Sequence, residues 1–433
     1  MYRITLFLVA LCLVSHGLLC PGSATADDWP QWRGPTRDGE WKETGIVDRF
    51  ASEQLAIKWR VPVGAGYSGP TVADGRVYLT DRETEPEQIE RIHCFNEQTG
   101  EVIWSVSYPA VYTISYKAGP RAAVTIEGGR AYALGAMGDL YCLDAASGEL
   151  KWKHDLKKLY EIQMPIWGIA AAPLIVEDVV ILQAGGRQAC IVALDKLTGV
   201  PRWKALDEKA SYSSPVLVQH AGQPVVVCWT GESVSGLAPA TGKVHWRYDF
   251  PPSRMPIGIA TPVVHENEIF VTSFYDGSLM LRMGEQVSSV SQVWRLVGEN
   301  ERETRGLHSI ISTPVRLGDH VYGVDSYGEL RCLEAASGKR IWEDLTATPR
   351  SRWSTIHFVR NGKRIWMFNE RGELIISELS PQGFKEISRA TLIAPTLNQL
   401  NQRNGVCWAH PAFANRHVFI RNDKELVCAS LAK

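Results

Sequence analysis

The sequence has no excess of charge of either sign. It contains 46 Lys and Arg residues against 47 Asp and Glu residues, so the formal net charge is −1. Proteins that bind nucleic acids or anionic membranes usually carry a basic surplus that attracts phosphate groups. We therefore expect no nucleic-acid partner. With 21% charged and 45% hydrophobic residues, the composition is that of a folded globular protein.

Long hydrophobic runs are also missing, apart from one near the N-terminus. Residues 4–14 are almost continuously apolar, Arg3 precedes them, and the small residues 23–26 follow. This run is shorter than the about 20 residues that a helix needs to span a bilayer. The order of charge, apolar run and small residues is typical of a cleaved secretory signal. We expect residues 1–26 to be a signal peptide, no transmembrane segment, and a periplasmic or extracellular mature protein.

A lipid anchor is the alternative for this N-terminus. Cys20 would be the modified residue and would attach the chain to a membrane surface. The residue before a lipidated cysteine is usually small, whereas here it is Leu19. The cleaved signal is therefore the favoured interpretation.

Cysteines that could pair are not apparent. Two of the nine cysteines fall in the predicted signal, the remaining number is odd, and there is no C-x-x-C motif. Cys94, Cys142, Cys332 and Cys428 recur at one position of a repeat, and equivalent positions cannot all bridge one another. We expect these side chains to be small buried hydrophobic groups in strands.

Short catalytic motifs are missing as well. Residues 64–69 match G-x-G-x-x-G, but Pro70 and a strand follow, whereas the dinucleotide-binding version opens a helix. The chain contains no H-E-x-x-H, G-x-S-x-G, Walker or EF-hand motif, and its eleven histidines do not fall at metal-binding spacings. The sequence therefore assigns no catalytic residue and no metal ligand.

Tryptophan, in contrast, is abundant and regularly spaced. The phrase Asp/Asn-x-x-Thr/Ser-Gly-x-x-x-Trp, with small variations, recurs along the chain. Its five close copies end at Trp104, Trp152, Trp203, Trp246 and Trp342. A degenerate copy ends at Trp294, and an isolated Trp59 precedes them all. Successive tryptophans from Trp59 to Trp342 are 43 to 51 residues apart, a period typical of β-propellers and solenoids.

Each repeat unit has the pattern of four antiparallel strands. Most units open with small residues and a proline, and short alternating apolar runs separated by Gly-rich turns follow. The Thr/Ser-Gly step predicts a tight turn in which the glycine takes a positive φ. The tryptophan in the outermost strand is placed to pack against the next unit. The fold class is therefore all-β, with each unit forming one blade of a propeller.

The number of units predicts how the ring closes. Six units end at a tryptophan, and a seventh runs from Trp353 to about Ile387 without one. An eighth opens at residues 409–411 and ends at Lys433, before any outer strand. Residues 55–60, which contain the isolated Trp59, would complete it. We expect an eight-bladed propeller over residues 55–433, with residues 27–54 as an arm packed on one face.

The repeated phrase resembles the tryptophan-docking motif of quinoprotein, or PQQ-like, β-propeller repeats. Residues 29–35, Trp-Pro-Gln-Trp-Arg-Gly-Pro, also resemble the start of many exported bacterial proteins with such repeats. The resemblance covers nearly all of the predicted mature chain. It implies one of two kinds of protein. One is a dehydrogenase that holds pyrroloquinoline quinone (PQQ) and Ca²⁺ on the axis, and the other is a cofactor-free scaffold of the BamB type.

Two features of the dehydrogenases have no counterpart in this sequence. Their quinone is covered by a ring formed from two adjacent cysteines, and no Cys-Cys pair occurs here. A Ca²⁺ site needs six or more oxygen ligands, and no cluster of acidic residues opens the blades. We therefore expect an exported binding or scaffold protein. The alternatives are a PQQ-dependent alcohol or sugar dehydrogenase with calcium, and a cell-surface carbohydrate or polymer binder.

The candidate binding residues lie just before the first strand of each blade, where the chain reaches the axial channel. Aromatic and cationic side chains there suit a planar or anionic ligand, although they could also simply fill the axis. Trp167-Gly168 resembles the ring-plus-glycine step near the quinone in the dehydrogenases. We expect a monomer that binds a protein partner or a small ligand at this axial face. The candidates are Tyr67, Arg121, Trp167, Tyr212, His308, Trp353, Trp408 and His410.

Overall fold

A computed structural model describes residues 27–433 of the chain. The predicted signal peptide and the alternative anchor at Cys20 lie outside these residues. Over the described part, the only helix is α1 (Leu156–Leu159), and no helix is long and apolar enough to cross a membrane.

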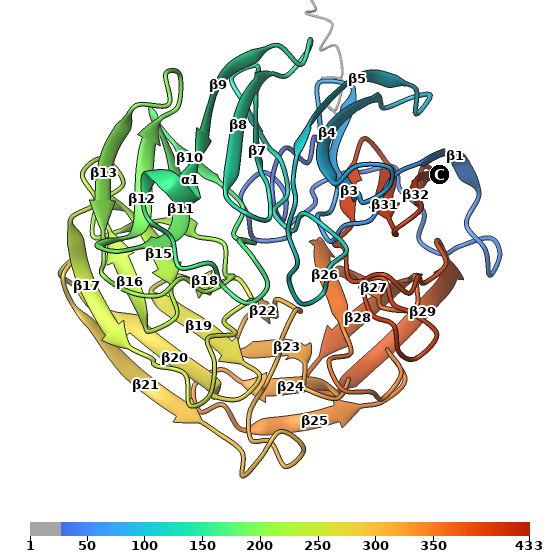
Figure 1. Cartoon of the computed structure of the whole chain (residues 1–433). Helices are drawn as coiled ribbons and strands as arrows, with labels where there is room; N and C mark the ends of the chain where they lie inside the picture. Colours follow the sequence, from blue (N-terminus) through green and yellow to red (C-terminus); the bar gives the residue numbers. More distant parts are fainter. Residues whose placement is uncertain (1–26) are drawn as a thin grey trace, which may run out of the picture.

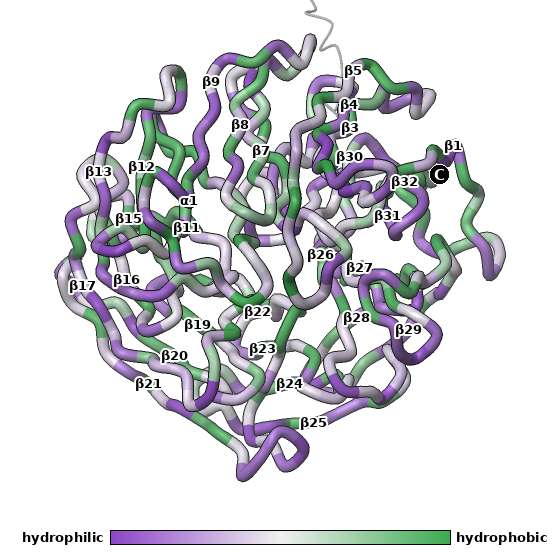
Figure 2. The backbone as a smooth tube through the Cα atoms, in the orientation of Figure 1, coloured by the Kyte–Doolittle hydropathy of each residue, from purple (hydrophilic) through white to green (hydrophobic). Residues whose placement is uncertain are grey.

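The described chain forms eight four-stranded antiparallel sheets arranged as the blades of a ring (Figure 1). This architecture confirms the predicted all-β, eight-bladed propeller. Within each blade the strands follow chain order from the axis outward, and the last blade is the exception described below. Figure 2 shows hydrophobic residues on inner strands such as β7 and hydrophilic residues on outer strands such as β17.

The first four blades cover the N-terminal half of the ring. Blade 1 consists of β2 (Thr71–Ala73), β3 (Arg76–Glu83), β4 (Ile89–Asn96) and β5 (Val102–Pro109). Blade 2 consists of β6 (Thr125–Glu127), β7 (Arg130–Leu134), β8 (Asp139–Asp144) and β9 (Leu150–Asp155). Blade 3 consists of β10 (Leu174–Val176), β11 (Val179–Gly186), β12 (Ala189–Asp195) and β13 (Pro201–Ala205). Blade 4 consists of β14 (Val216–His220), β15 (Gln223–Trp229), β16 (Ser233–Leu237) and β17 (Val244–Asp249).

The other four blades complete the ring. Blade 5 consists of β18 (Val263–His265), β19 (Glu268–Ser273), β20 (Gly277–Met283) and β21 (Val290–Leu296). Blade 6 consists of β22 (Val315–Leu317), β23 (His320–Val324), β24 (Leu330–Glu334) and β25 (Arg340–Asp344). Blade 7 consists of β26 (Ile356–Asn361), β27 (Arg364–Asn369), β28 (Glu373–Ser380) and β29 (Gly383–Thr391). Blade 8 consists of β30 (Ala412–Ala414), β31 (His417–Arg421), β32 (Glu425–Ser430) and β1 (Ile57–Pro62).

Blade 8 is built from both ends of the described chain. Strand β1 pairs antiparallel with β32, and Trp59 lies opposite Cys428. Strand β1 thereby supplies the outer strand that the C-terminal unit lacks, as the isolated Trp59 predicted. The observed strand covers residues 57–62, two residues further along than the predicted segment. All seven cysteines of the described chain are buried and unpaired.

Six docking tryptophans donate an indole hydrogen bond to the turn of the following blade, whereas the indole N–H of Trp246 has no partner in the described chain. The Trp59 indole N–H donates to the Glu97 carbonyl at 2.8 Å, and the ring lies over Gly100. Gly100 has a φ of +76°, and a Cβ atom there would come within 2.8 Å of the indole ring. Only glycine satisfies both conditions, which explains the Thr/Ser-Gly step of the repeated phrase. Corresponding indole bonds come from Trp104, Trp152, Trp203, Trp294 and Trp342.

Blade 7, which lacks a docking tryptophan, is closed differently. Its strand register places Ser388 where the other blades have tryptophan, one residue beyond Ile387. The Ser388 hydroxyl accepts a hydrogen bond from the Phe50 N–H at 3.0 Å. The Phe50 ring packs against Trp366 of β27, at 6.0 Å between ring centroids. Residues of the arm therefore fill the space that a tryptophan occupies elsewhere.

Candidate functional site

The arm closes one end of the axial channel by bonding to five consecutive blades. Trp29 exchanges two backbone hydrogen bonds of 2.9 Å with Val72 of blade 1, and the Pro30 carbonyl accepts from Ile126 of blade 2. The Arg37 guanidinium donates to backbone carbonyls of blades 3 and 4, at Ala172, Pro173 and Pro215. The indole N–H of Trp32 reaches the Thr261 hydroxyl of blade 5 at 2.7 Å.

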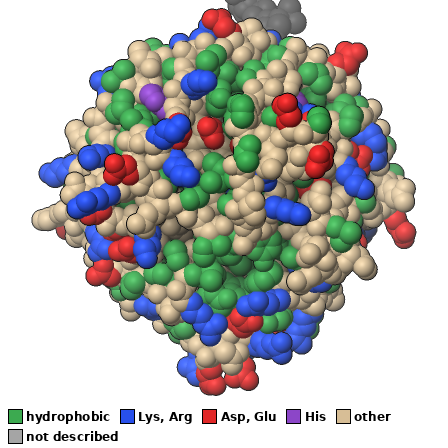
Figure 3. Space-filling model, viewed as in Figure 1, with side chains coloured by type: hydrophobic (Ala, Val, Ile, Leu, Met, Phe, Trp, Pro, Cys, Tyr) green, Lys and Arg blue, Asp and Glu red, His purple; other side chains and the backbone are tan. Residues whose placement is uncertain are grey.

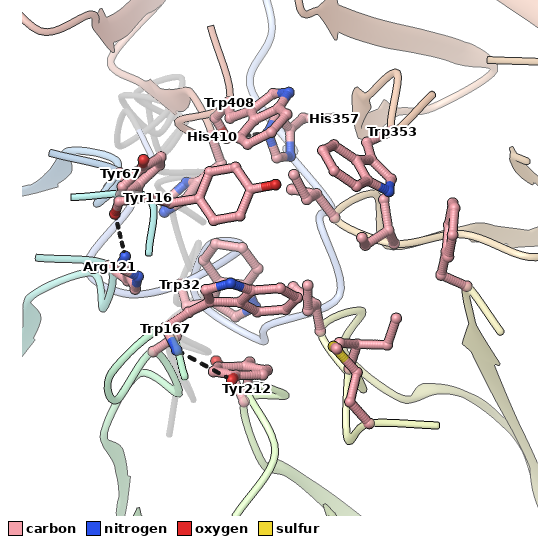
Figure 4. A pocket seen from close by; sticks show the side chains of 18 of the residues that line it. Trp32, Tyr67, Tyr116, Arg121, Trp167, Tyr212, Trp353, His357, Trp408 and His410 are labelled. Atoms are coloured by element: carbon pink, nitrogen blue, oxygen red, sulfur yellow. Dashed lines mark hydrogen bonds between the residues drawn. The ribbon is translucent and has the colours of Figure 1, made fainter. Parts of the chain in front are cut away.

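The other end of the channel is an open cavity of about 310 Å³ (Figure 4). Its walls come from the segments that precede the first strands of the blades. Trp32 of the arm also lines the cavity and stands edge-on to His410, at 4.3 Å between ring centroids. Because Trp32 bonds to Thr261, next to the strand openings, it forms the inner end of the funnel-shaped cavity.

The structure brings seven of the eight predicted site residues to this cavity. They are Tyr67, Arg121, Trp167, Tyr212, Trp353, Trp408 and His410. Their role in binding stays a prediction. Their shared position shows that the segments before the first strands face the axis, as the repeat pattern predicted.

His308 is the exception, and its placement at the axis was wrong. Its side chain is buried between blades 5 and 6. One ring nitrogen lies 3.0 Å from the Phe274 carbonyl, and the other accepts a hydrogen bond from the Gly298 N–H at 3.1 Å. His308 therefore links two backbone segments and is not available to a ligand.

A fixed position in the repeat identifies seven of the nineteen lining residues. In blades that open with a proline directly before the first strand, the third residue before that proline faces the cavity. Blade 2 has no proline at this point, but counting back from the same position gives Arg121. The residues at this position are Tyr67, Arg121, Ala170, Tyr212, Ile259, Ile311 and Trp408. In blade 7 the count gives Arg352, but Trp353, with a φ of +69°, lines the cavity instead. Ala170, Ile259 and Ile311 were not predicted, because only rings and cations at this position suggest a binding site.

Two further lining residues have no place in the repeat. Trp32 belongs to the arm, and Tyr116 belongs to the long connection between β5 and β6. No count from a blade proline could have found them. The remaining lining residues are Ser214, Met255, Ile257, Phe274, Tyr275, Ile310 and His357.

No carboxylate lines the cavity, and its single cation is already engaged. The Arg121 guanidinium donates to the backbone carbonyls of Ser115, Tyr116 and Gly119 and lies 4.8 Å from the centre of the Tyr67 ring. Burial lowers the pKa of Arg121 below its ordinary value. Arg121 therefore supports the cavity wall and contributes little free positive charge.

The two lining histidines are neutral at pH 7. Burial lowers the pKa of His357 to about 4 and that of His410 to about 3. The His357 ring lies 2.9 Å from the Trp408 carbonyl, so its N–H is used within the protein. Apart from the Arg121 guanidinium, the cavity lining carries no charge and consists mainly of aromatic and aliphatic side chains.

These residues do not fit PQQ with calcium. Calcium is held by six or more oxygens, usually including carboxylates, and the cavity offers none of the latter. Among residues 27–433 no group of three or more His, Cys, Asp and Glu side chains is arranged to hold a metal ion. PQQ itself carries carboxylates that need cationic partners, whereas Arg121 is bonded to backbone carbonyls. We derive no chemistry through this cofactor.

The comparisons with known proteins agree with the repeat pattern. A family model described as outer membrane protein assembly factor BamB matches residues 88–344. The outer membrane protein assembly factor BamB of Shewanella oneidensis is 26% identical over 305 residues, which cover 66% of this chain and 74% of that protein.

Solved structures share the fold at low sequence identity. BamB from Moraxella catarrhalis is 17% identical, covers 87% of this chain and 99% of its own, and superposes with a TM-score of 0.59. A europium-containing methanol dehydrogenase is 11% identical, covers 94% of this chain and 98% of its own, and superposes with a TM-score of 0.65. Both kinds of relative that the resemblance implied are therefore present among the fold neighbours. The family match covers more than half of the sequence, and the chain belongs to the family of PQQ-like β-propellers described as outer membrane protein assembly factor BamB.

Proposed function

We propose that this protein is an exported scaffold that binds a protein partner at the open axial face and acts in outer-membrane protein assembly. The observation that carries the proposal is the asymmetry of the channel. The arm closes one end with hydrogen bonds to five blades, while the other end presents a largely aromatic funnel without carboxylates. The assembly role is taken from the family and from the Shewanella oneidensis relative.

The side chains of the funnel are those that dominate protein interfaces. Trp, Tyr and Arg are enriched among the residues that contribute most to binding energy, and such residues cluster in desolvated pockets. Trp167, Trp353 and Trp408 line the funnel, and Arg352 stacks on Trp353 at 4.5 Å. Figure 3 shows hydrophobic side chains gathered in a hollow near the centre of this face, with basic side chains along its edge.

Export is part of the proposal. Residues 1–26 have the pattern of a secretory signal, which would deliver the protein to the periplasm or the cell exterior. A periplasmic location is the one in which a scaffold could meet outer-membrane proteins before they insert. Mass spectrometry of the purified protein tests this step, since cleavage after Ala26 predicts an N-terminus at Asp27.

Photo-crosslinking in living cells tests the partner. A benzophenone amino acid is placed at Tyr275, which lines the funnel, and in a control at Asp319, in the exposed turn between β22 and β23 at the other end of the ring. We expect one prominent adduct with a component of outer-membrane assembly from position 275 and none from position 319. Equal adducts from both positions, or none from either, would contradict the proposal.

The two alternatives have their own assays. Dye-linked oxidation of methanol, ethanol or glucose by the purified protein with added PQQ and Ca²⁺ would establish the dehydrogenase. Saturable binding on a glycan array would establish the carbohydrate binder. We expect neither, because the cavity lacks carboxylates for calcium and for the hydroxyl groups of a sugar.

A further inference from the structure

We propose that the ring of Tyr116 is a built-in plug that occupies a cage for an aromatic side chain, and that an aromatic residue with acidic neighbours on the partner protein displaces it. This inference rests on the proposed function and names the chemistry of the partner segment. It is carried by the position of Tyr116, by the way its loop is anchored, and by the charges around the funnel.

Tyr116 lies in the middle of the funnel among rings from separate blades (Figure 4). Its ring centroid is 5.8 Å from that of Trp167, 6.1 Å from Trp353 and 5.9 Å from Trp408. The interplanar angles with Trp167 and Trp353 are 76° and 78°, the edge-to-face arrangement that aromatic pairs prefer. These three indoles therefore form a cage whose shape and electrostatics suit one aromatic ring.

The cage belongs to the propeller, but the plug belongs to a surface loop. Strand β5 ends at Pro109 and β6 begins at Thr125, so Tyr116 stands in the middle of a long connection. Figure 1 shows this connection reaching from β5 toward the centre of the ring. Ser115 and Lys117, on either side of Tyr116, are exposed. The ring of Tyr116 is thus the part of this tip that is directed into the funnel.

The backbone of the loop is fixed from its base to its tip, whereas the Tyr116 side chain is held by packing alone. The Arg82 guanidinium donates to the Tyr112 carbonyl at 2.8 Å and to the Lys117 carbonyl at 3.2 Å. The buried Glu90 carboxylate accepts from the Tyr112 hydroxyl at 2.6 Å. The Arg121 guanidinium donates to the carbonyls of Ser115 and Tyr116, but the Tyr116 side chain forms no hydrogen bond with another described residue. The ring can therefore turn out of the cage about its own side-chain bonds while the backbone of the loop stays in place.

The backbone of Tyr116 is also in an unfavourable conformation. Its φ is +56°, in the left-handed region, where side chains with a Cβ atom are disfavoured by about 1 kcal/mol. The packing of the ring in the cage offsets this strain.

The charges around the mouth indicate what should flank the incoming ring. Arg254 lies over the face of Tyr275, a lining residue, at 4.7 Å from its centre. Arg254 forms no ion pair with another residue of the described chain, whereas Arg352, which stacks on Trp353, is paired with Glu301 at 2.6 Å. A free cation beside an aromatic cage favours a segment whose aromatic residue stands next to Asp or Glu. We therefore infer an acidic, aromatic-bearing segment of a protein as the occupant.

Fluorescence anisotropy with short labelled peptides tests this inference on the purified protein. The probe is a fluorescein-labelled pentapeptide with one phenylalanine between two aspartates, and matched peptides replace the phenylalanine by leucine or the aspartates by lysines. We expect the first peptide to bind at least about tenfold more tightly than either matched peptide. Equal binding of the leucine peptide would overturn the aromatic cage, and equal binding of the lysine peptide would overturn the acidic flank.

Variants of the loop test the plug itself. Tyr116→Gly removes the competing ring, and we expect it to tighten binding of the phenylalanine peptide about fivefold, since less of the protein is blocked. Lys117→Gly is the matched control and should leave the affinity unchanged. Trp353→Leu should weaken binding about tenfold by opening the cage. An unchanged affinity in Tyr116→Gly, with an unchanged circular-dichroism spectrum, would overturn the plug.

The outcome separates this inference from the scaffold role. If the position-275 crosslink to an assembly component persists in Tyr116→Gly and in Trp353→Leu with unaltered yield, the partner docks elsewhere on the face and the cage proposal fails alone. If the crosslink is absent in the unmodified protein, the scaffold proposal fails whatever the peptides do.

Discussion

The two ends of the axial channel are closed by opposite means. At the arm end, Arg37 and the backbone of residues 29–30 form hydrogen bonds with four blades, and most of these groups are buried. At the funnel end, one ring from a surface loop rests among apolar side chains without a hydrogen bond of its own. Directional polar contacts lock the first end, whereas non-directional contacts leave the second able to exchange its contents.

Breaking the closed end should have the largest effect. Arg37→Ala leaves the buried carbonyls of Ala172 and Pro215 without this donor, while the Pro173 carbonyl keeps its bond from the Thr125 hydroxyl. We expect the free energy of unfolding to fall by about 3 to 5 kcal/mol in urea denaturation. The control is Arg49→Ala, an exposed arginine of the arm that donates to one carbonyl, with an expected loss below about 1 kcal/mol. Similar losses for both variants would refute the distinction.

Removing the Trp32 ring, which separates the two ends of the channel, should have the next largest effect. Trp32→Ala deletes the inner wall of the funnel, the 2.7 Å bond to Thr261 and the edge contact with His410. We expect a loss of about 2 to 3 kcal/mol in the same assay. The aromatic peptide should also bind differently, because the cage would open into the arm end. Unchanged stability would mean that Trp32 is not part of the closure.

Acid should weaken the protein through the same inner region. The pKa of His357 is lowered to about 4 and that of His410 to about 3, whereas both titrate near 6.5 when unfolded. The unfolded chain therefore binds more protons between these values, and stability is lost as the pH falls below 6.5.

From pH 7 to pH 5.5 we expect a combined loss of about 2 kcal/mol from the two histidines. Urea midpoints measured over this range give the slope. His357→Gln and His410→Gln should each flatten it, while His265→Gln, a partly exposed histidine of β18, should leave it unchanged. A slope that persists in the double variant of His357 and His410 would assign it to other groups.

Changing the open end should have the smallest effect on stability. Tyr116→Gly removes a half-buried ring but also relieves the positive φ of +56°. We expect the lost packing of the ring and the relieved backbone strain to offset each other to within about 1 kcal/mol. The variant should therefore unfold at nearly the wild-type urea concentration. A loss as large as that of Arg37→Ala would show that the ring locks the funnel rather than filling it.

The parts of the fold that could be predicted are those whose sequence pattern recurs from blade to blade. The Thr/Ser-Gly and tryptophan positions revealed most blades because, at five of the eight seams, a φ-positive glycine lies directly under the indole. Trp59 revealed the closing strand for the same reason. The path of the arm was not predictable, because residues 29–41 occur once and bond mainly to backbone carbonyls, which carry no sequence signal.

The candidate site was predicted in part, for a related reason. Rings and cations at the blade openings suggested Tyr67 and Trp408, whereas Ile259 and Ile311, at the same repeat position, looked like ordinary core residues. Counting from the proline would have found them. Tyr116 could not be found in this way, because the connection that carries it belongs to one blade junction alone and its contacts are set by the ring as a whole.

The joint between β1 and β32 also governs when the molecule can finish folding. These two strands pair across more than 360 residues, so the outer edge of blade 8 is available long before its partner strands exist. If the chain is exported as proposed, this segment emerges from the membrane first and must stay unpaired until the C-terminal strands arrive. The ring would then become complete only after translocation, and closure would be a late step of folding in which the incomplete ring exposes unpaired strand edges.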